Sequence, residues 1–269
     1  MSRRRSGLAY QRRAYCYQCL DNKYNNIPIS TSLTPYVPPP TPPIPPSTSN
    51  SLFFDGSNNY LTMSPGITFG SQTTPFTIEC WFYSTVPPAS NQICIIGGAG
   101  GSSTNSITLY SNLNNSIFTL DSQGAANAPF TLPFTITQNV WYYIAVTRDT
   151  NSYIQLWIGT NTSGIATAST TTLAQYTTSG WNLNTASTYI GRWLNGVNPY
   201  NNGVYINNLR VTNTNLFTTS NPTIPVPTSN FTAITGTELL INTGSAIDQS
   251  NTQTITTIGS VPDSSLSPF

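Results

Sequence analysis

Between residues 51 and 230, short alternating runs of hydrophobic and polar residues are separated by turn-forming residues. The run from Phe76 to Tyr83 alternates strictly and lies between segments broken by glycine and proline. Because successive side chains of a β-strand point to opposite faces of the sheet, this period of two predicts a strand. One face would carry Phe76, Ile78, Cys80 and Phe82, and the other Thr77, Glu79, Trp81 and Tyr83.

Further strands are expected on both sides of this run. Before it, an apolar segment from Ser51 ends at the turn pair Asp55-Gly56, and another begins at Tyr60-Leu61. No long stretch has the period of a helix, so the pattern predicts an all-β sandwich or jelly roll. The later strands are expected at Gln92–Ile96, Ser106–Tyr110, Ser116–Asp121, Val140–Arg148, Tyr153–Ile158, Thr188–Gly191 and Val204–Thr212.

The composition indicates a large core under a surface with few charges. Of the 269 residues, 38% are hydrophobic and only 6% are charged, whereas about 25% charged residues are usual in soluble domains. Ser, Thr and Asn take the place of the charges, and such a surface suits packing into a larger assembly. No apolar run reaches the roughly 18 residues of a membrane helix, and no signal peptide is recognisable, so neither a membrane span nor classical secretion is expected.

Residues 1–34 form a basic arm with a net charge of +5, whereas the chain from residue 51 onward carries −4. This asymmetry predicts an interaction arm for a protein surface or, as a less favoured partner, nucleic acid. A merely solvated or packing tail explains the arginines equally well. The candidate contact residues are Arg3, Arg4, Arg5, Arg12 and Arg13.

The four cysteines do not indicate a metal site or a disulfide framework. Cys16 and Cys19 have half the spacing of a zinc ribbon, but no second pair follows and the chain has no histidine. Two reduced thiols or a local redox pair are therefore preferred there. Without a secretion signal, Cys80 and Cys94 are expected to be free thiols as well.

Residues 35–50 form a proline-rich linker, with eight prolines between Pro35 and Pro46. Proline fixes φ and lacks the backbone N–H, so a polyproline II segment is predicted. At about 3.1 Å per residue it would span roughly 35 Å. A stiff spacer is the simpler interpretation, and a proline-rich ligand for an aromatic groove is the alternative.

Three blocks of sequence resemble laminin-G-like domains of the concanavalin type. The opening pair SLFFDGSNNYLTM and PFTIECWFY, the hairpin VWYYIAVTRDTNSYIQLWIG, and YIGR followed by GVYINNLRVTNTNLFT occur in the order of that family. The resemblance implies an antiparallel β-sandwich jelly roll over residues 51–230. Residues 231–269 would then form a C-terminal strand and an extended tail, lying across this domain or a neighbour.

The tail sharpens the resemblance. Its sequence from Asn230, with an apolar strand, an Asp-Ser-Ser stretch and a final Ser-Pro-Phe, is similar to segments of bacteriophage and large-virus proteins that carry this domain. The resemblance therefore implies a viral protein.

The acidic residues argue against catalysis. Glycosidases need two carboxylates that flank the scissile bond, but the only glutamates are Glu79 and Glu238, and no two acidic residues lie within five positions of each other. Histidine-dependent nucleophilic catalysis is excluded as well. A non-enzymatic protein is expected, with glycoside hydrolysis as a remote alternative.

Calcium is the only cofactor for which the resemblance provides a reason, since many laminin-G-like domains bind it at a rim. Carboxylates and other oxygens would serve as ligands. Where relatives often carry a pair of aspartates, this chain has Asn207-Asn208, which lowers the charge of such a site. The candidate ligands are Asp55, Asp121 and Asp149, although Asp55 and Asp149 also suit turns for backbone reasons.

Sugar binding would use aromatic and amide side chains on loops. Trp81, Trp141 and Trp157 lie within expected strands, where packing is the simpler role. The loop from Trp193 to Gly203 differs, because it combines two aromatic residues with several asparagines. It could contact a ligand or partner, or pack on itself as a cap. The candidate contact residues are Trp193, Asn195, Asn198 and Tyr200, with Trp181 as a further candidate.

Together these observations predict a virion structural protein that is not an enzyme, such as a minor capsid, capsid-surface or tail component. Its arm and tail would contact other capsid or virion proteins, and assembly into particles would explain a surface-type domain without a secretion signal. The alternative is a carbohydrate-binding module that attaches to glycans of the host surface.

Overall fold

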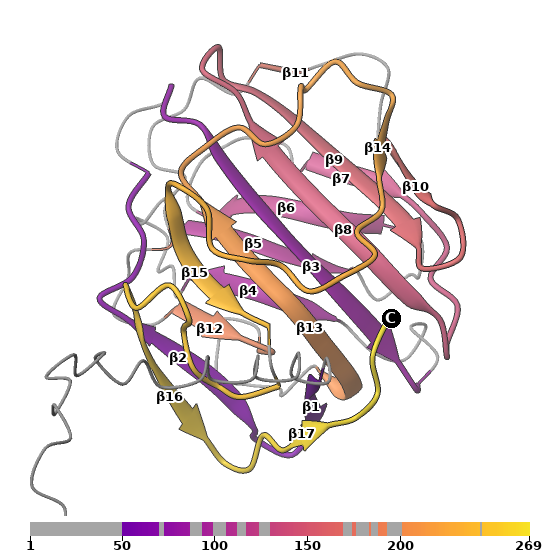
Figure 1. The fold of residues 1–269 in the computed structure, drawn as a ribbon, viewed down its shortest axis with the longest axis vertical. Coiled ribbons are helices and arrows are strands. Elements are labelled where there is room, and N and C mark those ends of the chain that lie inside the picture. The colour runs from indigo at the N-terminus through magenta and orange to yellow at the C-terminus, as the bar shows by residue number, and fades with distance from the viewer. Residues whose placement is uncertain are drawn as a thin grey trace, which may run out of the picture. The chain divides into compact units, whose positions relative to one another are not determined.

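The computed structural model describes residues 50–69, 73–86, 93–98, 106–111, 117–123, 130–168, 174–175, 183, 188–192, 201–242 and 244–269. The chain divides into two units, Met1–Ile44 and Pro45–Phe269, and all the described residues belong to the second. Throughout these ranges the regular elements are β-strands, arranged in two stacked antiparallel sheets (Figure 1). The predicted all-β sandwich is therefore confirmed.

The longer strands lie where the alternation of the sequence predicts them, whereas β7, β10, β11, β14, β16 and β17 were not expected. In chain order the strands are β1 (Ser51–Asp55), β2 (Tyr60–Ser64), β3 (Phe76–Ser84), β4 (Cys94–Gly98), β5 (Ser106–Ser111), β6 (Ile117–Gln123), β7 (Phe130–Pro133), β8 (Trp141–Arg148), β9 (Tyr153–Thr160), β10 (Ile165–Ala168), β11 (Ala174–Gln175), β12 (Thr188–Ile190), β13 (Asn202–Thr212), β14 (Thr223–Pro225), β15 (Thr237–Ile241), β16 (Thr254–Ile258) and β17 (Asp263–Ser264).

In the part of the chain that the structure describes, the larger sheet has ten strands in the order β14-β10-β9-β8-β3-β13-β1-β17, with β11 paired to β9 and β15 paired to β13. Within the same residues the second sheet has seven strands in the order β16-β2-β12-β4-β5-β6-β7. Figure 1 shows β3, β8 and β13 of the larger sheet in front of β4, β5 and β6.

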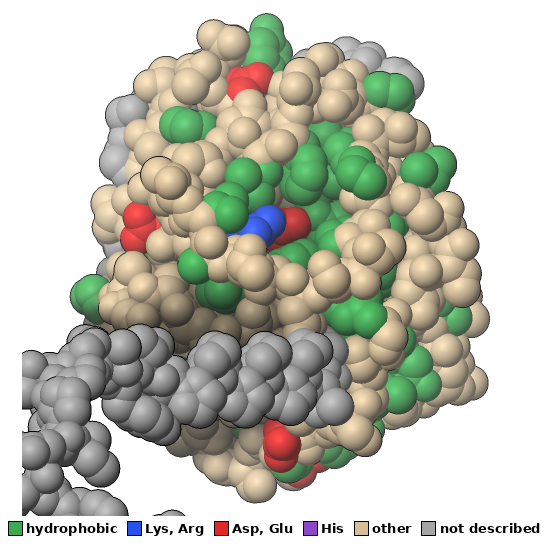
Figure 2. Space-filling model, in the orientation of Figure 1, with side chains coloured by type: hydrophobic (Ala, Val, Ile, Leu, Met, Phe, Trp, Pro, Cys, Tyr) green, Lys and Arg blue, Asp and Glu red, His purple; other side chains and the backbone are tan. Residues whose placement is uncertain are grey.

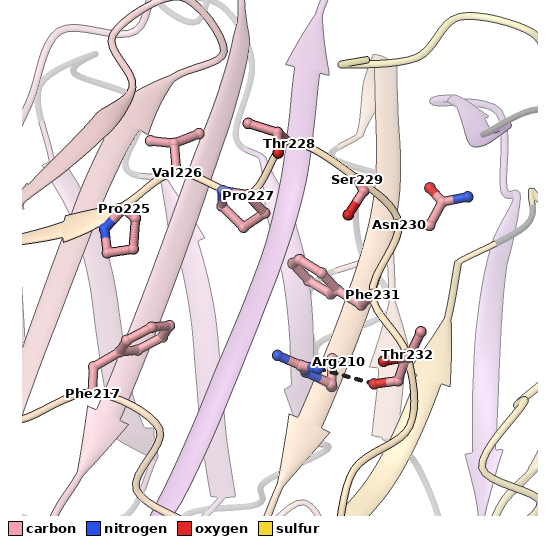
Figure 3. A pocket seen from close by; sticks show the side chains of 10 residues that line it. All are labelled: Arg210, Phe217, Pro225, Val226, Pro227, Thr228, Ser229, Asn230, Phe231 and Thr232. Atoms are coloured by element: carbon pink, nitrogen blue, oxygen red, sulfur yellow. Dashed lines mark hydrogen bonds between the residues drawn. The ribbon is translucent and has the colours of Figure 1, made fainter.

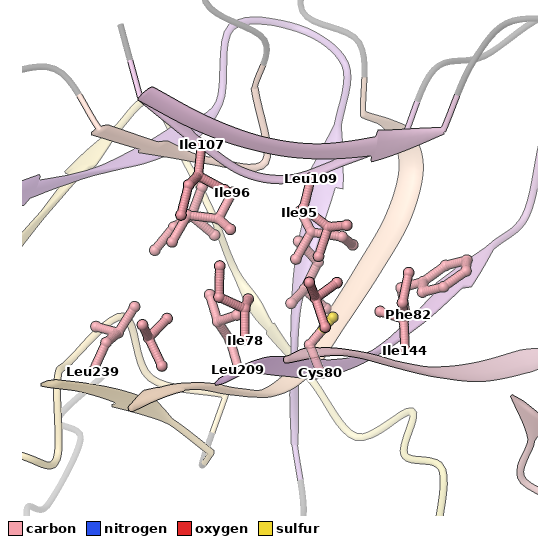
Figure 4. Close-up of a cluster of buried hydrophobic side chains, with 14 of the residues drawn as sticks. Ile78, Cys80, Phe82, Ile95, Ile96, Ile107, Leu109, Ile144, Leu209 and Leu239 are labelled. Atoms are coloured by element: carbon pink, nitrogen blue, oxygen red, sulfur yellow. The ribbon is translucent and has the colours of Figure 1, made fainter. Parts of the chain in front are cut away.

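The main core lies between the two sheets. It contains the apolar face that the alternation assigns to β3, and Ile78, Cys80 and Phe82 are fully buried there. Figure 4 shows them facing Ile95 and Leu109 of the opposite layer. Burial of one such side chain contributes about 1.5–3 kcal/mol, so this layer dominates the stability of the sandwich. Cys80 and Cys94 are both buried free thiols, as expected.

The opposite face of the larger sheet is covered as well. It carries a second buried cluster that includes Trp81, Trp141, Tyr143 and Trp157. The segment between β13 and β15 crosses in front of β3 and β8 (Figure 1) and adds buried Phe231 to this cluster. The three tryptophans therefore have the packing role expected from their strand positions, and both faces of β3 are dry.

The residues that follow 230 complete both sheets of the same domain. Strand β15 pairs with β13, β16 pairs with β2, and β17 pairs with β1. The tail therefore lies across its own domain, which is one of the two positions considered from the sequence.

Candidate functional site

The outer face of the larger sheet contains an open hollow of about 310 Å³, which we call the Arg210 hollow. Figure 2 shows basic and acidic atoms at its base, surrounded by hydrophobic side chains. Strand β13 supplies the base, and the segment between β13 and β15 supplies the walls (Figure 3). Its lining consists of Arg210, Phe217, Pro225, Val226, Pro227, Thr228, Ser229, Asn230, Phe231 and Thr232.

A bulge in β13 shapes this base. The register against β3 shifts between Asn207 and Arg210, and Asn208 adopts a positive φ of 52°. Its side-chain oxygen accepts a hydrogen bond from the backbone N–H of Phe231 at 2.7 Å, and its amide donates to the side chain of Asn230 at 3.0 Å. An amide does both at once, which an ionised aspartate cannot. Asn208 therefore fixes the wall segment to the sheet.

A buried ion pair lies under the hollow. Arg210 and Glu79 are directly opposite each other on β13 and β3. The guanidinium Nε donates to Glu79 Oε1 at 2.8 Å, and the Tyr143 hydroxyl donates to Glu79 Oε2 at 2.5 Å. The side chains of Arg210 and Glu79 are 12% and 1% exposed. Because a buried charge is costly unless it is paired, this cluster fixes the arginine in place.

The electrostatics follow from burial. Burial raises the pKa of the Glu79 carboxyl, an effect that the Arg210 charge and the Tyr143 hydrogen bond oppose. Burial and the neighbouring Glu79 raise the pKa of the Tyr143 hydroxyl well above its usual value. Glu79 is 1% exposed and already bonded to Arg210 and Tyr143, so neither group is free to exchange a proton with a ligand in the hollow.

The guanidinium is also held from the side of the wall. Its Nη1 donates to the carbonyl of Thr232 at 2.9 Å, and the Phe231 ring lies 4.7 Å from its central carbon. Figure 3 shows Arg210 close to Phe231, with one nitrogen directed towards Phe217. The hollow therefore offers an oriented cation edge between two aromatic rings.

The wall side chains combine apolar and hydrogen-bonding groups. Phe217 is half-buried and packs edge-on against Trp157, with 5.8 Å between ring centroids. Thr228 and Ser229 are exposed, and Asn230 is partly exposed. An aromatic ring beside hydroxyl and amide groups suits a ligand with both apolar and polar faces. Among the described residues that line the hollow there is no carboxylate, and Glu79 at its base is only 1% exposed, so the arrangement favours binding over acid–base chemistry.

Most site residues proposed from the sequence lie outside the described residues. These are the loop residues Trp193, Asn195, Asn198 and Tyr200, the more distant Trp181, and the arm residues Arg3, Arg4, Arg5, Arg12 and Arg13.

The described end of that loop is structural. Asn201 is 1% exposed, and its side chain bonds both the N–H and the carbonyl of Cys94, at 2.7 and 2.8 Å. This bidentate contact ties the loop end to β4.

The structure describes the side chains of two of the three candidate calcium ligands, Asp55 and Asp149. Asp55 ends β1 and accepts a hydrogen bond from the N–H of Ser57 at 2.8 Å, which lowers its pKa. Asp149 lies in the β8–β9 turn, and Asp121 lies in β6, where its side chain is not described. Among the described residues, no three His, Cys, Asp or Glu side chains gather as a metal site would require.

Asp149 is occupied by its own turn. One carboxylate oxygen accepts from the N–H groups of Asn151 and Tyr153, at 2.8 and 3.0 Å, and the other accepts from the Thr219 hydroxyl at 2.7 Å. These bonds account for the aspartate by the turn geometry considered from the sequence.

Sequence reasoning did not identify the residues of the Arg210 hollow. Its walls come from an irregular segment with no periodic pattern. One signal was present, since Glu79 is the only charged residue of β3 and Arg210 is the only charged residue of β13. Two opposite charges on the same face of a sheet would each need a partner, so they could have been paired.

Three solved structures are similar to this chain. A pentraxin of Limulus polyphemus has 14% identity and a TM-score of 0.44, over 64% of this chain and 79% of that one. A Bacteroides ovatus protein described as carbohydrate binding has 17% identity and a TM-score of 0.50, over 80% of this chain and 61% of that one. Mouse laminin α1 domains LG4-5 have 13% identity and a TM-score of 0.42, over 70% and 45%.

This chain therefore spans less than two thirds of the last two structures. Among curated protein sequences, no match was found. None of the described residues form a helix that could cross a membrane. The sequence model of the concanavalin A-like lectin/glucanases superfamily matches residues 55–219, more than half of the chain. The chain belongs to the concanavalin A-like lectin/glucanases superfamily.

Proposed function

We propose that this domain is a non-catalytic carbohydrate-binding module and that the Arg210 hollow is its binding surface. The observation that carries the proposal is the lining, which combines aromatic, hydroxyl and amide groups around one fixed arginine. The fold supports it, because the superfamily is named for lectins as well as glucanases.

In this proposal Phe217 presents its half-buried ring to the apolar face of a sugar. Thr228 and Ser229 exchange hydrogen bonds with sugar hydroxyls at the exposed rim. Arg210 donates the N–H groups that are directed into the hollow, while Glu79 keeps its charge paired below. The site then selects a ligand by shape and hydrogen bonding, without a proton transfer.

A glycan array with the full chain tests the proposal. Phe217→Ala should weaken the binding of the glycans that the parent protein retains by about tenfold or more, because an aromatic contact and its buried area are lost. Thr228→Val removes one hydroxyl at almost constant shape and should have a smaller effect. Ile247→Ala, at a 63% exposed site outside the lining, is the control and should bind as the parent does. An array without signal, with folded protein, would contradict the proposal.

A second variant locates the site. If Trp193→Ala abolishes binding and Phe217→Ala does not, glycan recognition belongs to the Trp193–Gly203 loop. Repeating the array with a chelator tests calcium, for which Asp55 and Asp121 remain candidates.

We also propose that the chain is a structural component of a virus particle. This second function rests on the charge asymmetry between the arm and the body and on the stiff proline-rich segment. The arm would bind other virion proteins, so deletion of residues 1–46 should abolish incorporation into particles. Unchanged incorporation would refute the docking role, and glycan binding would be unaffected by that result.

A further inference from the structure

We propose that the aromatic surface under the segment Leu266–Phe269 is a groove for proline-rich peptide. In this structure the chain's own Phe269 packs edge-on against Trp81 of this surface, and in an assembly the surface would receive the run Pro35–Pro46 of a second copy. This inference goes beyond glycan binding and does not depend on it. We call this surface the tryptophan groove, formed by Trp81, Tyr83 and Trp141.

Three adjacent strands build the groove from rings. Tyr83 of β3 contacts Trp141 of β8, with 5.4 Å between the ring centroids, and Tyr205 of β13 at 5.7 Å. Trp81 lies on the same face of β3 and packs against Tyr143 at 5.5 Å. The rings are tilted against one another, at 46° for Tyr83–Trp141 and 47° for Trp81–Tyr143, and together they form an aromatic wall of the kind on which proline rings pack.

The chain's own segment shows what this surface accepts. The Phe269 ring stands edge-on to Trp81, with 5.9 Å between centroids and an angle of 88°, and Pro268 is buried. The segment is held by few polar contacts. Ser51 donates to the carbonyl of Leu266 at 2.7 Å, and Asn161 donates to that of Pro268 at 3.4 Å. The segment Leu266–Phe269 follows β17 and belongs to no strand. Because few polar contacts hold it, another peptide can take its place.

Two buried donors await an acceptor. Trp81 and Trp141 are 0% and 4% exposed, and neither indole N–H has an acceptor within the part of the chain that the structure describes. Trp157, in the same cluster, donates to the carbonyl of Asn221 at 2.9 Å. An unpaired buried N–H costs free energy, so a ligand with spare acceptors is favoured.

A polyproline II segment has such acceptors. It makes no internal hydrogen bonds, so its carbonyls are available, and its rings are ordered before binding. The run Pro35–Pro46 is such a sequence, and it carries no charge that would need a partner in the groove. Each copy of the chain therefore contains one groove and one ligand. A head-to-tail contact between copies satisfies both.

The test measures binding of a fluorescent peptide of residues 35–50 to the full chain. The chain's own segment competes at a high effective concentration, so Phe269→Ala, which removes its ring contact, should bind the peptide about tenfold more tightly than the parent. In this background Trp141→Phe keeps a ring but removes the N–H, and should lower affinity roughly three- to tenfold. Trp157→Phe is the matched control, because its N–H is already satisfied, and should not change peptide affinity.

Thermal unfolding confirms that each variant is folded, and if Phe269→Ala is not, Ser51→Ala loosens the same segment by removing one hydrogen bond. A peptide with every proline replaced by alanine should not bind. The proposal is overturned if neither variant of the segment binds the peptide, if Trp141→Phe binds as well as its parent, or if the groove retains glycans in place of peptide. The oligomeric state of full-length Phe269→Ala is measured without peptide. The proposal is also overturned if this variant stays monomeric at chain concentrations that, for the peptide, would saturate the groove.

Discussion

Replacing Arg210 by methionine tests the structural role of the buried ion pair. The change leaves the Glu79 carboxylate, 1% exposed, without its cation. Breaking a buried pair on one side costs about 3–5 kcal/mol. Since Arg210 is itself 12% exposed, we expect the lower end, about 3 kcal/mol, a large fraction of the usual 5–15 kcal/mol of domain stability.

The pH dependence of stability distinguishes the effect of an unpaired buried charge from the effect of lost packing. Burial raises the pKa of folded Glu79 above the 4.5 of an unperturbed carboxyl, and Arg210 opposes the rise. In Arg210→Met the pKa rises further. A carboxyl whose pKa is higher in the folded than in the unfolded protein contributes most to stability below its unfolded-state pKa. This contribution is lost as the pH rises through the folded-state pKa. The variant should therefore be less destabilised near pH 5 than near pH 8.

Urea unfolding at both pH values measures this, with the midpoint and slope fitted separately. Adding Glu79→Gln removes the stranded charge and should restore about 1–2 kcal/mol near pH 8. An Arg210→Met variant that is destabilised equally at both pH values, or that gains nothing from Glu79→Gln, would refute the role assigned to the pair.

Three further predictions concern stability and reactivity. Asp248→Asn should cost about 1–3 kcal/mol by urea unfolding. Burial raises the pKa of Asp248, but its several hydrogen bonds lower it more, to a net value below 3.8. Its contribution is thus present above about pH 4 and lost in stronger acid, so only the parent should show that loss. Asn208→Ala removes the bond to Phe231 and places alanine at positive φ, and should lower the melting temperature by several degrees. Cys80 and Cys94 should resist a thiol reagent until the protein unfolds, because burial raises both thiol pKa values.

The central strands were predictable because they satisfy a local rule. In β3 the inner positions are all apolar, whereas the outer positions include the polar Thr77 and Glu79, so alternation alone placed Ile78 and Cys80 in the core. The same rule cannot say which strands are neighbours. Arg210 and Glu79 are 131 positions apart, and their contact follows from the order of strands in the sheet.

The edge strands and the walls of the Arg210 hollow depend on tertiary context. Strand β14 contains three residues, one of them proline, and it forms a strand because β10 offers a free edge. Phe217 and Phe231 lie in an irregular segment whose position is set by Asn208. From the sequence, Asn207-Asn208 indicated only a reduced chance of calcium binding. That Asn208 fixes a distant segment could not be predicted, because this role depends on the bulge in β13.

The pairing of the last strands with the first has a consequence for biosynthesis. Strand β1 lies between β13 and β17, and β2 lies between β12 and β16. A nascent chain emerging from the ribosome therefore carries β1 and β2 with unpaired edges until residues 254–264 have been made. Domains dominated by such distant contacts fold over milliseconds to seconds, and exposed edges invite aggregation meanwhile. This domain should complete its fold only after β16 and β17 have been synthesised, and a chain interrupted before residue 254 should depend on chaperones for its solubility.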